Sequence, residues 1–337
     1  MTHIQRQYFL ASLPAALVGL WSLGDGVRSQ AAEGADVLQL SLINSLQMSS
    51  ESAGGVLVAA ALGASFFLPL LLTVSITSRA WAEIFARARG RSIDEGWFLS
   101  AWLYVLLLPA TLPLHYAALG FSFGAVFGCY VFGGTGRYVV NPTLLGVAFI
   151  SISYPDLFAQ NHWLPGSDVL ASWTLVATEG IEAAASGGTS WAALFLGTEI
   201  GALGTSSALA ALLGASYLIA RRVASAGIVV GALIGLAIAG TLFGEIPSLW
   251  HLVLGNFAFV LAFIATDRTT QPRTTAGCWA YGALFGFLIV VLRTADPARP
   301  EATVSALLLA SLCVPLIDHI ASSTVPGART PQDVGRE

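Results

Sequence analysis

The chain is organised as a series of long apolar runs, and short stretches between them hold the charged residues. Windows without Asp, Glu, Lys or Arg are 7–24, 52–78, 97–136, 138–155, 200–220, 223–244, 246–266 and 274–292. Most of them reach the roughly 20 residues that a helix needs to cross a bilayer. Because a spanning segment must satisfy its backbone hydrogen bonds internally, this pattern predicts an all-α polytopic membrane protein.

Three segments set the expected number of spans. Window 97–136 is long enough for two crossings, and two prolines and a histidine in its middle mark the turn between them. Segment 183–220 adds a sixth span, which Glu199 and several glycines interrupt, and segment 302–321 adds the last. The total is about ten transmembrane helices, some of them broken at glycine.

Composition excludes the main classes of soluble protein. Hydrophobic residues make up 55 % of the chain and charged residues only 10 %, against roughly 25 % charged residues in soluble domains. The start, MTHIQRQYFLASLPAALVGLW, has no small-residue cleavage site, which indicates a retained first span. No basic footprint for nucleic acid is present. The three cysteines lie in apolar segments without a C-x-x-C pair, so this chain alone encodes neither a disulfide framework nor a metal site: Cys129, Cys278 and Cys313.

The arginines predict the orientation in the membrane. All fifteen basic residues are Arg, and with both termini in the cytoplasm only Arg28, Arg293 and Arg299 lie outside. Cytoplasmic loops carry an excess of positive charge in membrane proteins. Segment 155–189, which has four acidic residues and no basic one, is then extracytoplasmic. The arginines predicted to lie inside are Arg6, Arg79, Arg87, Arg89, Arg91, Arg137, Arg221, Arg222, Arg268, Arg273, Arg329 and Arg336.

The chain is expected to form one membrane domain over residues 1–322. Segment 79–94 is too charged to span, and its apolar residues at helical spacing predict a helix at the cytoplasmic interface. The Pro-, Gly- and charge-rich tail 323–337 is expected to be disordered. A weak echo between PLHYAALGFSF at 113–123 and PSLWHLVLGNFAF at 247–259 fits an internal duplication, whose symmetry stays open.

Two glycine-rich segments differ from what a plain anchor needs. In FGGTGRYVVNP, residues 132–142, glycines with Asn141 and Pro142 replace helix at or near membrane depth. Such backbone is tolerated where it is buried in protein or lines a cavity. Either a tight interhelical turn or a ligand- or ion-lining loop explains it. In the sixth span, the Gly197 and Gly201 pair indicates either a broken helix or a helix-packing motif.

Three carboxylates lie within or at the edge of apolar spans. Glu199, Asp267 and Asp318 each cost several kcal/mol in such a position unless they are paired, protonated or hydrated. Glu199 and Asp267 are therefore candidates for an ion path. For Asp267 and Asp318, which lie near a predicted cytoplasmic boundary, an interfacial cap or ion pair is the alternative.

Several motifs, in order along the chain, resemble a known family. VFGGTGRYVVNPTLLGVAF, ALFLG-x-x-x-GALG-x-SSALAALLGA and HLVLGNFAFVLAFIATD are similar to segments of NqrB, a membrane component of the Na⁺-translocating NADH:quinone oxidoreductase. The related RnfD component of Rnf complexes is a weaker match. The likeness runs from about residue 8 to residue 322.

The resemblance implies a non-autonomous subunit of a multisubunit complex in the bacterial inner membrane. Such complexes move electrons from a dinucleotide or ferredoxin through flavins while pumping Na⁺ or H⁺, with quinone as a further candidate partner. No catalytic residue is assigned to this chain. The alternative is a flavin-free relative that acts as a transporter, a channel or a scaffold.

Two flavins are implied by the resemblance. A non-covalent riboflavin lies near the G-G-T-G…N-P loop of the family, which corresponds here to Gly133, Gly134, Thr135, Gly136, Arg137 and Asn141. Tyr138 stands where the family tends to have a second Asn. A covalent FMN is attached to the Thr of an S-G-A-T motif, which this chain lacks. Thr178, in an Ala-Thr pair, is the first candidate for the attachment, and Thr189, in Ser-Gly-Gly-Thr, is the second.

Two carboxylates of the family are displaced in this chain. Cys129 and Tyr130 stand where the family commonly has Lys-Glu before the loop, and Thr205 stands where it has a Glu. Glu199, six residues before Thr205, is a candidate substitute, while Asp267 is kept. The expected ion path therefore includes Glu199 and Asp267.

The arginine distribution leads to a labelling prediction. In a variant without native cysteines, we expect Pro165→Cys to react with a membrane-impermeant thiol reagent in sealed cells and Thr330→Cys to react only after lysis. The opposite pattern, with position 330 labelled and position 165 protected, would overturn the predicted orientation.

Overall fold

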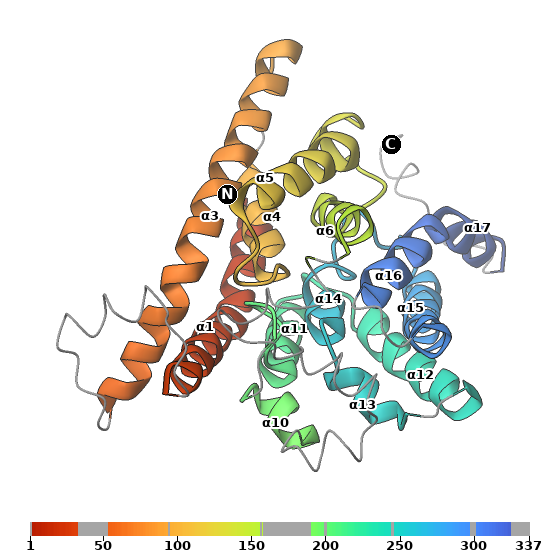
Figure 1. Cartoon of the computed structure of the whole chain (residues 1–337). Coiled ribbons are helices and arrows are strands. Elements are labelled where there is room, and N and C mark those ends of the chain that lie inside the picture. The colour runs from red at the N-terminus through yellow and green to blue at the C-terminus, as the bar shows by residue number, and fades with distance from the viewer. Residues whose placement is uncertain are drawn as a thin grey trace.

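The fold is taken from a computed structural model, which describes residues 2–32, 53–93, 95–155, 157, 190–198, 201–243, 246–296 and 301–324. The described residues form helices and connecting loops, without a β-strand among them, as the sequence predicts (Figure 1). The α-helices are α1 (His3–Ala32), α3 (Ala53–Arg89), α4 (Trp97–Leu106), α5 (Leu114–Phe123), α6 (Pro142–Ser153), α10 (Trp191–Leu196), α11 (Ala208–Ala220), α12 (Ala226–Phe243), α13 (Ser248–Val253), α14 (Phe257–Phe263), α15 (Thr275–Ala295), α16 (Ala302–Leu312) and α17 (Val314–Thr324).

The helices form two groups with a central layer between them. In Figure 1, α1 and α3 lie side by side at one edge, and α12, α15 and α16 lie together at the other. Helices α6, α11 and α14 lie between these groups, and α10 and α13 lie at one end of the central layer. A seven-residue π-helical segment, η1 (Gly124–Tyr130), continues α5 toward the glycine-rich loop.

Four of the described helices are long and apolar enough to cross a membrane: His3–Ser29, Gly55–Arg89, Ala226–Phe243 and Thr275–Ala295. A fifth is added if Ala302–Leu312 and Val314–Ser323, which meet at a bend of 45°, are taken as one span. Other apolar segments form shorter helices, such as α4, α6 and α11. The all-α membrane fold is therefore confirmed, while the total of ten spans stays a prediction.

Helix α3 differs from the expectation for segment 79–94. Residues 79–89 are helical, but they continue α3 without a break instead of starting a separate helix. No glycine or proline lies between residues 70 and 89 to end the helix. At about 1.5 Å per residue, its 37 residues extend over about 55 Å. This length exceeds the roughly 30 Å of a hydrocarbon core, so one end of α3 projects beyond it. Whether the projecting end lies along the membrane surface stays a prediction.

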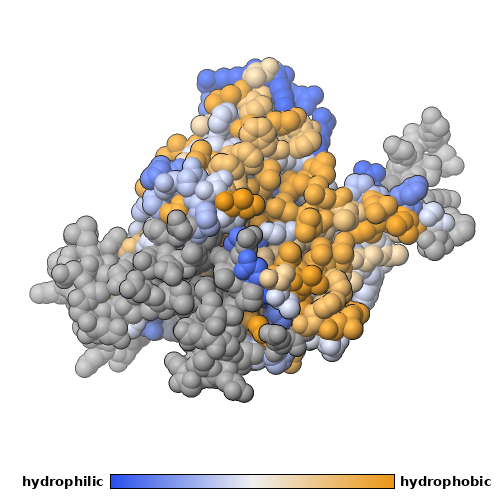
Figure 2. Space-filling view, turned by 45° about the vertical axis from the view of Figure 1, so that its right-hand side comes forward, coloured by the Kyte–Doolittle hydropathy of each residue, from blue (hydrophilic) through white to orange (hydrophobic). Residues whose placement is uncertain are grey.

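The surface has the distribution expected of a membrane protein. Figure 2 shows a broad apolar surface across the middle of the molecule, while hydrophilic residues gather at the upper end of the view. Large apolar side chains are exposed on the spanning helices, among them Leu68, Leu72, Ile234 and Leu242. Because lipid replaces water around these helices, their exposure carries no solvation cost.

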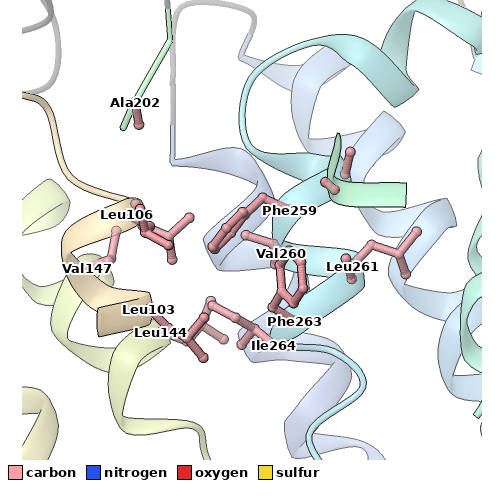
Figure 3. Close-up of a cluster of buried hydrophobic side chains, with 14 of the residues drawn as sticks. Leu103, Leu106, Leu144, Val147, Ala202, Phe259, Val260, Leu261, Phe263 and Ile264 are labelled. Atoms are coloured by element: carbon pink, nitrogen blue, oxygen red, sulfur yellow. The ribbon is translucent and has the colours of Figure 1, made fainter. Parts of the chain in front are cut away.

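Part of the buried core lies between α4, α6 and α14, and α14 packs most closely against α11. All seven residues of α14 are buried. Figure 3 shows Leu103 and Leu106 of α4 and Leu144 of α6 facing the aromatic rings of α14. Because this apolar cluster fixes α14 against two other helices, it also fixes the loop that follows α14.

Where helices break inside the apolar segments, backbone groups at the break form hydrogen bonds with residues from elsewhere in the chain. Helix α10 ends at Gly197, in the left-handed region (φ 93°), and α11 begins eleven residues later, so the predicted broken helix is confirmed. The amide of Gly204, between them, donates to the carbonyl of Leu106 at 2.8 Å.

A second break separates α13 from α14 at Gly255 (φ 64°). The buried guanidinium of Arg293 donates there to the carbonyls of His251 and Leu254 at 2.9 and 2.8 Å.

Close packing of α12 on α15 depends on small residues. A Cβ added at Gly235 would lie 2.0 Å from the carbonyl oxygen of Ala283, and one added at Gly286 would lie 1.9 Å from that of Ala232. Both contacts are with backbone, which cannot rotate away. Small residues let membrane helices approach each other in this way, and here they replace larger interlocking side chains.

We expect Gly235→Ala to lower the free energy of unfolding by about 1–3 kcal/mol, because α12 and α15 must separate to admit the methyl group. The measurement is an SDS titration in detergent micelles, followed by circular dichroism. Ile238→Ala on the exposed side of α12 is the control and should change stability by less than about 0.5 kcal/mol. Equal stability of Gly235→Ala and the parent would show that the two helices are less closely packed than described.

Candidate functional site

The glycine-rich loop that follows η1 is shaped by its backbone. Gly133, Gly134 and Gly136 have φ values of 119°, 99° and 86°, which residues with a side chain rarely adopt. The amides of Gly133 and Gly134 donate to the carbonyls of Tyr130 and Cys129, which fastens the loop to the end of η1. The loop is thus an ordered structure and not only a connection between helices.

The loop ends in a capped helix. Asn141 is the N-cap of α6, and its Oδ1 accepts a hydrogen bond from the amide of Thr143 at 2.9 Å. Pro142 follows at the first helical position, where a missing N–H costs nothing. The cap leaves the amide nitrogen of the Asn141 side chain available for a partner outside the helix.

That partner is Asp267, which follows α14. Nδ2 of Asn141 donates to Oδ2 of Asp267 at 2.8 Å, and the hydroxyl of Tyr138 donates to the same oxygen at 2.7 Å. The other carboxylate oxygen, Oδ1, accepts from the amide of Thr269 at 3.0 Å. Asp267 therefore links the loop before α6 to the turn after α14, more than 120 residues apart in sequence.

Electrostatics favour this arrangement. Burial, together with the Asp267 carboxylate, raises the pKa of the Tyr138 phenol above its usual value, so this loop residue stays protonated and donates. Hydrogen bonds to an ionised acceptor are stronger than those between neutral groups. On the other side of the site, Tyr8 of α1 donates to the carbonyl of Thr266 at 2.6 Å. Three distant segments are thereby held around one carboxylate.

A cavity of about 220 Å³ lies beside Asp267. Asn141, Tyr138 and Thr135 of the loop line it, together with residues of α1, α4 and α14. Its polar groups include the hydroxyls of Ser100 and Thr143, and its apolar wall includes Leu99, Leu103 and Phe263. Apolar walls with a few polar groups are typical of small-molecule binding sites.

The cavity shares its walls with two larger ones. Thr135 also lines a cavity of about 390 Å³ at the end of α3, together with Gly133, Gly134 and Arg137. Tyr138 and Thr269 also line a cavity of about 520 Å³ beside α17. Of the loop residues expected at one riboflavin site, the structure thus places Asn141 at the small cavity and Gly133, Gly134 and Arg137 at the second. Thr135 lies between the two. Gly136 is not among the lining residues of either.

The remaining predicted residues have different outcomes. Thr178, Thr189 and Glu199 lie outside the described residues. Asp318 accepts hydrogen bonds from the amides of Arg273 and Thr274 at the start of α15, which is the cap that the sequence left as an alternative. Among the described ranges, no cluster of three or more His, Cys, Asp or Glu residues could hold a metal ion.

Sequence reasoning missed the contacts of Tyr138 and Tyr8. In the sequence, Tyr138 is only a departure from the family pattern, although in the structure it donates to Asp267 as Asn141 does. Tyr8 lies in the first span and gave no signal in the sequence beyond its apolar surroundings. The two tyrosines reach residues 129 and 258 positions away, so local pattern could not have paired them.

Comparison with known proteins agrees with this architecture. The sequence model of the family described as "NQR2, RnfD, RnfE family" matches residues 1–327. The chain belongs to this family. The B subunit of a Na⁺-translocating NADH-quinone reductase from Neisseria meningitidis serogroup A is 37 % identical, covering 93 % of this chain and 82 % of the relative. The protein of the same name from Azotobacter vinelandii is 40 % identical over 76 % of this chain and 67 % of the relative. That from Pseudomonas aeruginosa LESB58 is 36 % identical over 92 % and 81 %.

The Asn141–Asp267 contact leads to a prediction that is tested by exchanging the amide and the carboxylate between the two positions. Asn141→Asp keeps the helix cap but places a second carboxylate against Asp267, so we expect it to lower the free energy of unfolding by about 3 kcal/mol. The double variant Asn141→Asp, Asp267→Asn restores one amide and one carboxylate and should recover at least half of the loss. The measurement is an SDS titration in micelles. Additive effects of the two substitutions would show that the side chains are not in contact.

Proposed function

We propose that this chain is the membrane subunit of a redox-driven, ion-translocating NADH–quinone reductase complex. Membership of the family and 36–40 % identity to proteins named as the B subunit of such a reductase support the proposal. The observation that carries it is the cavity at the loop of residues 132–142, held by Asp267. The partners are the other subunits of the complex, the bilayer and quinone. The location is the bacterial inner membrane, with both termini in the cytoplasm.

The same cavity is the proposed place of a non-covalent riboflavin, which supplies reversible electron transfer when bound. The residues fit such a group in kind, because the lining includes the polar residues Ser100 and Asn141 and the apolar residues Leu103 and Phe263. Its volume of about 220 Å³ is below the roughly 300–1,000 Å³ of typical ligand pockets. Room for a whole flavin therefore includes part of the cavity of about 520 Å³, with which it shares Tyr138 and Thr269.

The residues around the cavity have defined tasks in this proposal. Asp267 has one oxygen engaged by Tyr138 and Asn141 and the other by Thr269, so its first task is to hold the loop in place. Apolar residues from α4 and α14 exclude water from one side of the cavity. Glu199 remains the proposed carboxylate of the ion path. Thr178 remains the first candidate for the attachment of a covalent FMN, and Thr189 the second.

Flavin content tests the cofactor part of the proposal. We expect purified protein to release riboflavin on acid denaturation, and Ser100→Leu, which fills the cavity, to release about tenfold less. Ser122→Leu, on α5 and outside the lining residues, is the matched control and should keep the flavin.

A covalent flavin is tested separately. When the chain is co-expressed with a flavin transferase and denatured, it should fluoresce in a gel. Thr178→Ala should reduce this fluorescence more strongly than Thr189→Ala. A wild-type protein without either flavin would favour the alternative of a flavin-free transporter, channel or scaffold.

Ion transport tests the assignment of the carboxylates. In the assembled complex in proteoliposomes, we expect Glu199→Gln to slow ion movement while assembly stays intact, because a carboxylate within an apolar span persists only where it is paired, protonated or hydrated. We expect Asp267→Asn to lower stability and complex yield instead, since its carboxylate accepts three hydrogen bonds. If Glu199→Gln transports normally while Asp267→Asn assembles normally but does not transport, the two roles are reversed.

A further inference from the structure

The cavity of about 390 Å³ at the end of α3 has a different chemistry from the site beside Asp267. Three guanidinium groups line it, those of Arg89, Arg91 and Arg137, and Ser92 adds a hydroxyl. Glu95 is the one carboxylate among the lining residues that the structure describes. The described lining therefore carries a net positive charge of about two, which favours an anionic ligand.

The arginines come from two parts of the chain: Arg89 and Arg91 lie at and just after the end of α3, and Arg137 lies in the glycine-rich loop. Arg89 donates to the carbonyl of Tyr130 at the end of η1, and its guanidinium lies 5.2 Å from the ring centre of Phe85. Arg137 lies over the glycine turn, since a Cβ on Gly133 would be 3.2 Å from its Cδ. Because its contacts with Tyr130 and Phe85 fix the Arg89 side chain, part of the ordering cost of binding is already met at that residue.

The cavity lies beside exposed apolar residues. Phe85, Ala86 and Ile93 form an apolar part of its wall. Val131 and Phe132 are 56 % and 50 % exposed and directly precede the lining residues Gly133 and Gly134. Figure 2 shows hydrophilic residues at one end of the molecule directly beside the apolar surface. A ligand here can therefore place a charged group among the arginines and an apolar tail along η1.

We propose that this cavity binds the phosphate group of an anionic phospholipid. Guanidinium groups match phosphate in geometry and charge, and basic pockets beside membrane helices recognise lipid headgroups. A free phosphate would use the same arginines, but it would gain nothing from the exposed apolar residues at the border. The site does not depend on flavin binding. The arginines that line it are also different from Arg268, which lines the cavity beside Asp267.

The test measures lipid binding to the full chain, purified in detergent and delipidated. Native mass spectrometry during titration with phosphatidylglycerol should show one saturable adduct, and phosphatidylcholine with the same acyl chains should bind at least tenfold more weakly. Arg91→Gln should weaken phosphatidylglycerol binding about fivefold, and Arg91→Gln with Arg137→Gln on the order of 25-fold. Arg87→Gln is the control: Arg87 lies near the end of α3, its side chain is 79 % exposed and pairs with Glu83, and it is not among the lining residues. Its loss should change binding less than twofold.

Four results would overturn the proposal. Equal binding of the two lipids would show that headgroup charge is not recognised. Equal losses for Arg87→Gln and Arg91→Gln would reduce the effect to general surface charge. Displacement of the lipid by millimolar inorganic phosphate would assign the cavity to a soluble anion, and displacement by riboflavin would assign it to the flavin.

Discussion

The structure depends on one constraint, that backbone N–H and C=O groups within a bilayer must find partners inside the protein. At two breaks among the described residues, a group from a distant part of the chain supplies the missing partner. Gly204 donates to the end of α4, and Arg293 donates to two carbonyls at the break between α13 and α14. The side chain of Asn141 caps α6 in the same sense. Broken helices therefore remain stable at depth, and their breaks create the irregular backbone from which a site can be built.

The site beside Asp267 follows from this principle. Its carboxylate binds the loop before α6 and the turn after α14, and both segments adjoin the apolar cluster of α4, α6 and α14. The residues that hold the loop are therefore also those that line the cavity. A change at Asp267 acts on stability and on the site together, so its role in ion movement has to be separated from its role in folding by experiment.

The loop of residues 132–142 contributes to two cavities of different chemistry, one with apolar walls and one lined by arginines. Asn141 and Tyr138 face a small cavity with apolar walls, whereas Gly133, Gly134 and Arg137 face a basic one. A single motif, read as one flavin site in the sequence, thus contributes to two surfaces. The left-handed conformations of Gly133, Gly134 and Gly136 turn the chain between the two cavities.

The sequence by itself determined the fold class, the broken sixth span and the family. Apolar run length and glycine position are local properties, and the bilayer turns them directly into helices and breaks. The sequence also identified Asn141 and Asp267 separately. Only the tertiary structure decided that they touch, that Tyr138 joins them, and that Arg89 and Arg137 line the same cavity, because these contacts join segments far apart in the chain. It also decided that residues 79–89 continue α3, since helix propagation across a charged boundary depends on cooperative backbone bonding that no periodicity of side chains reveals.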